Sequence, residues 1–141
     1  MRVEALIRRA PVTISSSATI KQAAEVFVRE KIGLLVVAST ATPVKAEAVI
    51  SERDIVRAVA VGTSLNAPLD SVSTKKLVRV GRTDNLSKAA NLMFENNIRH
   101  LVVENSDGSL YGVLSIRDFF RESKLLEGFR KDEETEVHGG D

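Results

Sequence analysis

The sequence contains no cysteine and no tryptophan, and aromatic residues make up only 4% of its 141 residues. Without cysteine there is no disulfide, no thiolate metal site and no cysteine nucleophile. The core must therefore be built mainly from aliphatic side chains. No segment approaches the ~18 apolar residues of a membrane span, and the first eleven residues carry too many charges for a secretory signal. We expect a cytoplasmic domain that does not enter a membrane.

The sequence also lacks an excess of charge and the usual catalytic groups. Its 20 basic and 19 acidic residues give a net charge of +1, so nothing in the overall charge favours nucleic acid or an anionic membrane. Any anion must be recognised by a few placed residues. The chain has two histidines, His100 and His138, and no glycine-rich phosphate loop. Because no metal cluster and no nucleophile–base pair is evident, we predict that the protein is not an enzyme and needs no metal or catalytic cofactor.

The chain repeats itself. At an offset of 66, residues 12–14 fall on 78–80, and the apolar residues of 20–28 fall on those of 86–94. After a loop that differs by two residues the offset is 64, so that residues 49–54 fall on 113–118. So many matched apolar positions indicate an internal duplication.

Each half shows the same order of elements. Period-2 and period-3.6 patterns predict strands and helices in the order β-α-β-β-α, with Thr19 and Asn85 as N-caps and helix ends near Gly62 and before Gly128. The expected strands are 12–14, 34–38, 46–50, 77–80, 101–104 and 110–114. The predicted organisation is repeat 1 at 1–62, a connector at 63–76, repeat 2 at 77–128 and a flexible tail at 129–141. The fold class is α+β, with the two small sheets packed together because neither repeat is expected to have much core alone.

The sharpest motif is Ser-x-x-Asp, which occurs where the third strand of each half meets the following helix, as Ser51…Asp54 and Ser115…Asp118. One interpretation is a capping box that only satisfies the helix N-terminus. The other is a ligand site, because free amides, a hydroxyl and a carboxylate can hold the polar groups of a nucleotide. The spacing alone does not decide between these interpretations.

With these motifs, the chain from about Val12 to Arg121 resembles a pair of CBS domains, the family named after cystathionine β-synthase. A Gly-hydrophobic-x-Ser/Thr-x-x-Asp motif closes each repeat in that family. Residues 112–118 match it fully, and residues 48–54 match it except that Ala48 replaces the glycine. The resemblance implies that each Asp holds ribose hydroxyls, that each Ser lies near ribose or phosphate, and that strands of the opposite repeat complete the site.

Carried over residue by residue, the resemblance implies two nucleotide sites in the cleft between the repeats. We call them the Asp54 site and the Asp118 site. The Asp54 site would contain Val49, Ser51, Asp54, Leu77, Val78, Ile98, Arg99 and His100. The Asp118 site would contain Val113, Ser115, Asp118, Pro11, Val12, Ile32, Gly33 and Leu34. Arg53 and Arg117, each just before the aspartate, would add positive charge for phosphates.

The two predicted sites are not equal, because Arg99-His100 stands where the first repeat has Gly33-Leu34. In the family, basic residues at these positions contact phosphate, which arginine binds through a bidentate fork. We therefore predict that the Asp54 site binds a nucleotide more tightly than the Asp118 site. Taken in isolation, the same two residues would be a solvated arginine and an ordinary strand histidine.

The resulting hypothesis is a regulatory module that binds AMP, ADP or ATP, forms a homodimer and acts on an unknown effector protein. One alternative is a ligand of the S-adenosylmethionine type, which the neutral Gly33-Leu34 pair permits. Another is a dimerisation module that binds no nucleotide and uses its Ser-x-x-Asp pairs only as caps. Nucleic-acid binding has the least support, because the basic residues are scattered.

Overall fold

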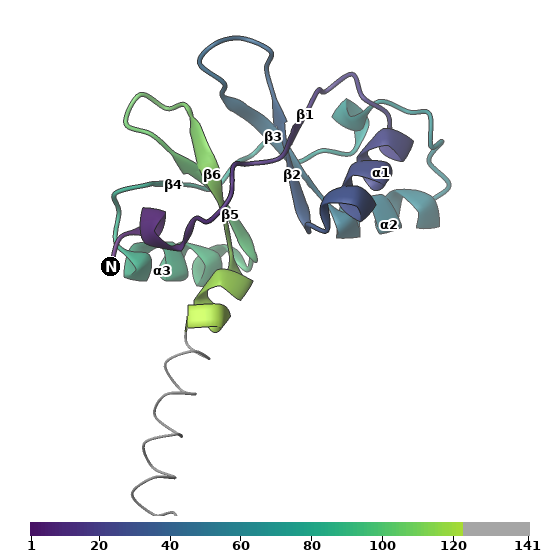
Figure 1. Cartoon of the computed structure of the whole chain (residues 1–141). Helices are drawn as coiled ribbons and strands as arrows, with labels where there is room; N and C mark the ends of the chain where they lie inside the picture. Colours follow the sequence, from purple (N-terminus) through teal and green to yellow (C-terminus); the bar gives the residue numbers. More distant parts are fainter. Residues whose placement is uncertain (123–141) are drawn as a thin grey trace, which may run out of the picture.

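The computed structural model describes residues 1–122 and shows two three-stranded sheets, each accompanied by helices (Figure 1). The first repeat contains β1 (Thr13–Ile14), α1 (Ile20–Glu30), β2 (Leu34–Ala38), β3 (Ala46–Ser51) and α2 (Glu52–Ala60). The second contains β4 (Arg79–Gly81), α3 (Leu86–Asn96), β5 (His100–Glu104), β6 (Leu110–Ser115) and a helix at 116–122. The predicted α+β fold with two β-α-β-β-α repeats is confirmed.

Both sheets have the same pairing. The first strand runs parallel to the second, and the second runs antiparallel to the third, in the orders β1-β2-β3 and β4-β5-β6. The first strand of each repeat is shorter than predicted and begins at Thr13 or Arg79. The residues before them still lie beside the sheet, because the carbonyls of Val12 and Val78 accept hydrogen bonds from the second strand. The predicted end of the last helix before Gly128 and the predicted tail at 129–141 lie outside the described residues.

The predicted helix caps are present with one exception. Thr19 forms a capping box with Gln22 at the start of α1. α2 ends in a Schellman turn, in which Gly62 has a φ of 81° and donates to the carbonyl of Val59. Asn85 occupies the N-cap of α3, but its side chain makes no capping hydrogen bond. Its backbone instead pairs with Arg2 in an isolated antiparallel bridge, which links the start of the chain to the second repeat.

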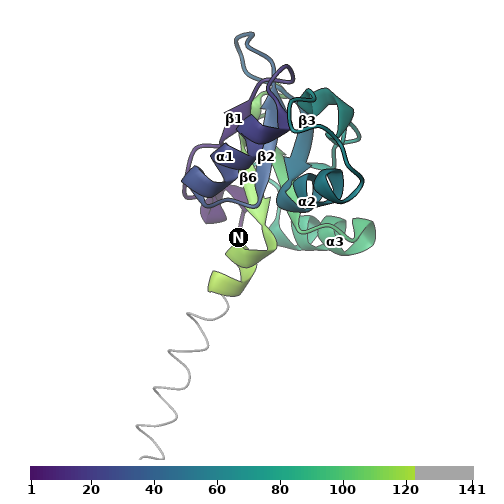
Figure 2. The same ribbon diagram turned by 90° about the vertical axis from the view of Figure 1, so that its right-hand side faces the viewer.

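Each repeat has a hydrophobic core of its own, so the expectation of little core per repeat is wrong. In the first repeat, α1 buries Ile20, Ala23 and Phe27 against β2 and β3. α1 and α2 lie side by side over the same face of that sheet (Figure 2). The second core contains Ala89 and Met93 of α3 together with Leu101, Val103 and Leu114 of the second sheet. Because successive side chains of a strand point to opposite faces of the sheet, every second side chain lies beneath the helices.

The other faces of the two sheets pack together, as predicted. The buried residues of this contact are Val36, Ala38, Ala46 and Val102. A backbone hydrogen bond of 2.8 Å from the amide of Leu110 to the carbonyl of Val44 joins the β2–β3 loop to β6. The apolar contact and this hydrogen bond make the two repeats one unit.

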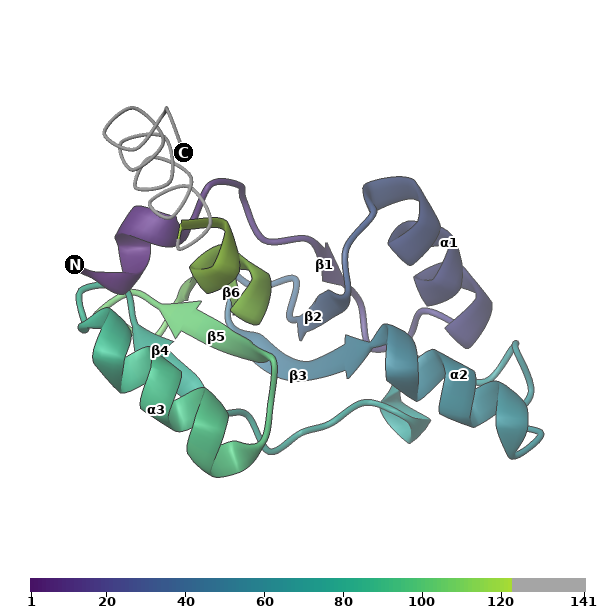
Figure 3. The same cartoon turned by 90° about the horizontal axis from the view of Figure 1, so that it is seen from below.

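The two short 3-10 helices each pack against the repeat that they do not precede. Val3 and Leu6 of η1 (Val3–Leu6) are buried in the core of the second repeat. Leu69 of η2 (Leu69–Ser71) is buried in the core of the first. From η1 the chain crosses to β1 in the other sheet (Figure 3). Residues 1–7, which the sequence analysis grouped with repeat 1, are therefore part of the packing of repeat 2.

Candidate ligand-binding site

Ser51 and Asp54 form a complete capping box at the start of α2. The Ser51 amide donates to Oδ2 of Asp54 at 2.8 Å, and the Asp54 amide donates to Oγ of Ser51 at 3.2 Å. The other carboxylate oxygen, Oδ1, lies 3.5 Å from the guanidinium of Arg57, whose side chain is 68% exposed. An exposed ion pair of this kind contributes only ~0–1 kcal/mol, so a ligand hydroxyl can replace Arg57. The capping box is therefore present, and it leaves acceptor capacity on the Asp54 carboxylate.

The second repeat has the same carboxylate contact but a different hydroxyl contact. The Ser115 amide donates to Oδ2 of Asp118 at 2.8 Å. Oγ of Ser115 accepts from the amide of Arg117 at 3.2 Å rather than from that of Asp118. Within residues 1–122, Asp118 has no ion-pair partner, in contrast to Asp54. A carboxylate has about four lone-pair positions, so each aspartate, fixed by one backbone amide, can accept further hydrogen bonds.

The predicted apolar residues divide into two groups. Val49, Leu77 and Val113 meet in the contact between the sheets, so that residues of both repeats come together as the family resemblance implies. The others pack, half-buried, against the core of their own repeat: Val12 and Ile32 against the first, Val78 and Ile98 against the second. Pro11 is half-buried in the segment that crosses between the repeats.

The strand register places His100 beside Ser115 and Leu34 beside Ser51. Directly opposed residues of antiparallel strands project from the same face. His100, assigned from the sequence to the Asp54 site, thus lies on the same face as a serine of the Asp118 site. Leu34, assigned to the Asp118 site, lies in the same way beside Ser51. These neighbours could not be predicted from the sequence, because the pairing of the strands, and not the order of residues along the chain, fixes them.

His100 also contacts the first repeat. A Cβ built on Gly33 would lie 3.5 Å from Nε2 of His100 and 3.8 Å from Oε1 of Glu52. Burial lowers the pKa of His100 below its usual value, and the neighbouring Arg117 lowers it further. The Asp118 carboxylate opposes this shift, Arg99 adds to it, and Glu52 opposes it. The imidazole therefore lies between charged groups of both repeats.

The predicted arginines are exposed at the edge of this region. Arg53, Arg99 and Arg117 all have exposed side chains. The carbonyl of Arg99 accepts from the Ile116 amide at 2.8 Å, and that of Gly33 accepts in the same way from Glu52 at 3.2 Å. Each helix that follows a Ser-x-x-Asp serine is thereby tied to the residue just before the second strand. Glu52 was not among the predicted site residues, although its position directly after Ser51 could have indicated that it lies at the site.

The described residues offer little for other chemistry. Among residues 1–122 there is no cluster of three or more metal-ligating side chains, and no helix is long and apolar enough to cross a membrane. Two open hollows lie away from the Ser-x-x-Asp turns, one over Ala24 and Val28 of α1 and one beside Thr83 and Asn105. They lack the paired aspartate and backbone amides, so the turns remain the better candidate.

Two packed α+β repeats, each closed by a Ser-x-x-Asp turn at a helix N-terminus, define a tandem-repeat module with polar turns at corresponding positions of the two repeats. The CBS domain family matches residues 3–61 and 69–125, so the chain belongs to the CBS domain family and contains a pair of its domains. The resemblance stated from the sequence is confirmed.

Solved structures and a curated relative agree with this assignment. The CBS domain protein PAE2072 from Pyrobaculum aerophilum, complexed with AMP, is 41% identical, with a TM-score of 0.83 over 90% of this chain and 97% of that one. The CBS domain pair of MJ0100, in complex with 5'-methylthioadenosine and S-adenosyl-L-methionine, shares the fold at 20% identity, with a TM-score of 0.78 over 91% of this chain and 97% of that one. An uncharacterized 17.7 kDa protein of Acidianus ambivalens is 34% identical over 77% of this chain. The chain spans 64% of the length of that relative.

Proposed function

We propose that this CBS domain pair is a regulatory module that binds an adenine nucleotide, AMP, ADP or ATP, between its repeats and acts on a partner protein. The observation that carries the proposal is the pair of aspartates, Asp54 and Asp118, each fixed by one backbone amide and each with acceptor capacity left. A ribose diol needs two such acceptor positions. The 41% identical protein that was solved with AMP supports the same class of ligand.

Ligand binding would act through the relative orientation of the repeats. A nucleotide held by residues of both repeats stabilises the arrangement that it bridges, by about 2.7 kcal/mol at a hundredfold excess over Kd. A partner that prefers this arrangement then binds more tightly, and by linkage the partner also strengthens nucleotide binding. The proposed module thus regulates without carrying out a reaction.

A thermal-shift panel tests the ligand class. AMP, ADP, ATP, GTP and S-adenosylmethionine are each added at a hundredfold excess over the expected Kd. For a chain of this size, binding should raise Tm by on the order of 10 °C. A shift with S-adenosylmethionine alone would favour the alternative ligand, which the complex of MJ0100 illustrates for that protein. If no adenine compound changes Tm, the proposal is wrong and a dimerisation module is the better description.

Calorimetry with AMP tests the ranking of the two sites. Asp54→Ala should weaken AMP binding more than Asp118→Ala, because Arg99 has no basic counterpart in the first repeat, where Gly33 stands. Far-ultraviolet circular dichroism of both variants controls for folding, since each substitution also removes a capping acceptor. Equal losses of affinity would contradict the ranking without contradicting nucleotide binding.

We also propose that the module forms a homodimer through its helices. Val28 of α1 and Phe94 of α3 are equivalent in the duplication and are 80% and 87% exposed. Val56 of α2 and Phe120 of the helix at 116–122 are likewise equivalent, at 66% and 61% exposed. Large apolar side chains exposed at the same positions of both repeats are typical of an association surface.

The oligomeric state tests this surface. Sedimentation analysis should show a dimer for the unmodified chain and a monomer for Phe94→Asp, because a carboxylate would be buried without a partner at the interface. Leu65→Asp is the matched control, since Leu65 is also exposed, at 48%, but lies in the connector. An unmodified chain that sediments as a monomer would refute the dimer.

A further inference from the structure

Glu52 is the first residue of α2, and its carboxylate lies at the Asp118 site. Its Oε1 is 3.8 Å from the Cβ position of Gly33, a residue of that site, and Nε2 of His100 is 3.5 Å from the same position. His100 in turn lies opposite Ser115 in the strand register. The carboxylate thus faces the Ser-x-x-Asp turn of the second repeat, although Glu52 itself belongs to the first.

The charge of Glu52 is not neutralised by the protein. Glu52 is exposed, and among residues 1–122 its carboxylate has no ion-pair partner. Its backbone is fixed, because the amide donates to the carbonyl of Gly33 at 3.2 Å and so holds the start of α2 beside the site. The negative charge acts on the site, since it opposes the lowering of the pKa of His100. A carboxylate in this position repels every negative charge of a bound ligand.

The Asp54 site has no acidic residue at the corresponding place. At the offset of 64 the counterpart of Glu52 is Ile116, which is half-buried and packs against the core of the second repeat. The two residues are held alike, because the Ile116 amide donates to the carbonyl of Arg99 at 2.8 Å as the Glu52 amide does to that of Gly33. The duplication therefore places a carboxylate at one site and an aliphatic side chain at the other.

The basic residues nearby do not remove this difference. Arg53 and Arg117 occupy corresponding positions of the two turns, and both are exposed. His100 adds little positive charge at neutral pH, because burial lowers its pKa and favours the neutral imidazole. The carboxylate of Glu52 thus remains as an additional negative charge at the Asp118 site.

We propose that Glu52 is a specificity-determining residue, whose carboxylate makes the Asp118 site select adenosine compounds with little negative charge, AMP in preference to ATP. This inference rests on the proposed function, because it requires an adenine compound at that site. In a medium with the dielectric constant of water, each unit of ligand charge ~7 Å from the carboxylate changes Kd about threefold. The same carboxylate attracts a ligand of net positive charge, such as S-adenosylmethionine.

Calorimetry in an Asp54→Ala background, in which the Asp118 site remains, measures the effect of Glu52→Gln on four ligands. The Kd of adenosine should not change, AMP should bind about threefold more tightly, and ATP should gain more than AMP. S-adenosylmethionine should bind more weakly, because its positive charge loses an attractive partner. A role of Glu52 in packing alone would instead change all four affinities in the same direction.

Three controls accompany these titrations. Glu25→Gln removes the same charge from an exposed position of α1, beside the hollow over Ala24 and Val28, and should leave the four Kd values unchanged. Glu52→Ile introduces the residue of the second repeat and should act like Glu52→Gln, which guards against new hydrogen bonds from the amide. In an Asp118→Ala background, which retains the Asp54 site, Glu52→Gln should leave the ratio of AMP to ATP affinity unchanged.

Far-ultraviolet circular dichroism establishes that each variant is folded. A uniform change of the four Kd values, or an equal effect of Glu25→Gln or of Glu52→Gln in the Asp118→Ala background, overturns the inference. An Asp54→Ala protein that binds none of the ligands, although the unmodified chain binds them, overturns it as well. Failure of the unmodified chain to bind any adenine compound would instead overturn the proposed function.

Discussion

Gly112 of β6 has no room for a side chain, and this gives the sharpest test of the packing. A Cβ built on Gly112 would lie 2.8 Å from Cγ2 of Ile7, well inside the ~3.5–4.0 Å of an ordinary carbon–carbon contact. In the first repeat the equivalent position is Ala48, which is buried. At the offset of 66, Ile7 corresponds to Ser73, a shorter side chain. We infer that Gly112 is glycine because Ile7 covers it.

The perturbation is Gly112→Ala, and its magnitude follows from two opposing effects. Overpacking typically costs about 1–3 kcal/mol. The added methyl group also restricts the unfolded chain, which returns about 0.4–1 kcal/mol where the backbone suits alanine, as in this extended strand. The middle values of these ranges give a net loss of about 1.3 kcal/mol in the free energy of unfolding. Replacing Ile7 by serine, the residue at the corresponding position 73, should remove the clash.

Urea unfolding followed by far-ultraviolet circular dichroism measures these effects, since the chain has no tryptophan. The proteins are the unmodified chain, Gly112→Ala, Ile7→Ser and the double variant. The double variant should be more stable than the sum of the two single losses predicts, by about 1 kcal/mol, because the residues are in contact. Additive losses, or a Gly112→Ala protein as stable as the unmodified chain, would refute the reasoning.

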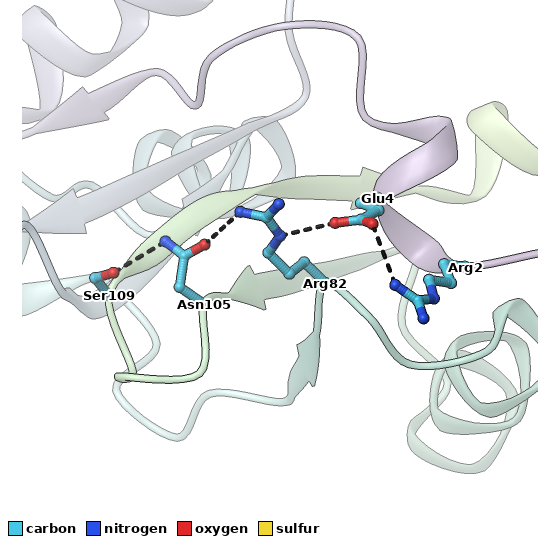
Figure 4. A network of polar contacts seen from close by, with 5 residues as sticks. All are labelled: Arg2, Glu4, Arg82, Asn105 and Ser109. Atoms are coloured by element: carbon cyan, nitrogen blue, oxygen red, sulfur yellow. Dashed lines mark hydrogen bonds and ion pairs between the residues drawn. The ribbon is translucent and has the colours of Figure 1, made fainter.

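Three further predictions concern single side chains. Arg82 donates to Glu4 at 2.7 Å (Figure 4). Its guanidinium also lies over the ring of Tyr111, 4.5 Å from the ring centroid, so Arg82→Ala should lower the free energy of unfolding by about 1–2 kcal/mol. Arg2→Ala, which removes only a 3.8 Å surface contact, should change it by less than about 0.5 kcal/mol in the same urea titration. Lys31 ends α1 at a φ of 55°, where the second repeat has Asn97, so Lys31→Asn should raise the thermal midpoint by a few degrees. The backbone amide of Gly81 lowers the pKa of Asp84 below its ordinary value of 3.8. The Asp84 carboxylate therefore stabilises the fold at pH values above 3.8, and this stabilisation is lost as the pH falls through the lower pKa of the folded state. Acid titrations should show a shallower loss of stability in Asp84→Asn than in the unmodified chain, and identical acid limbs would contradict this.

The duplication was visible in the sequence because apolar residues recur at fixed positions of helices and strands, and those patterns depend on local geometry. The same offset also holds upstream of the first strand, where Val3 corresponds to Leu69 and Leu6 to Val72. The two short 3-10 helices, η1 and η2, lie upstream of the strands at which the predicted duplication begins, so they were not predicted. The offset shows that the two short helices are equivalent, but it does not show that each one packs against the other repeat.

The placement of His100 depended on information that the sequence did not contain. The family resemblance assigned Arg99-His100 and Gly33-Leu34 to opposite sites as pairs of neighbours in the chain. Only His100 and Leu34 lie in strands, because Arg99 and Gly33 directly precede β5 and β2. The members of each pair therefore need not serve the same site. Strand register decides which one meets a given serine, and register arises from pairing between segments distant in sequence.

The places where the two repeats differ most informatively are those where one repeat touches the other. Ile7 from the start of the chain faces Gly112, and His100 of the second repeat faces Gly33 of the first. In both contacts a larger side chain packs against a glycine from a distant part of the chain. When a residue of one repeat is substituted by its counterpart from the other repeat, the residue that it contacts must be substituted as well, because each repeat forms part of the packing environment of the other. The unequal chemistry predicted for the two sites has the same origin as the unequal packing.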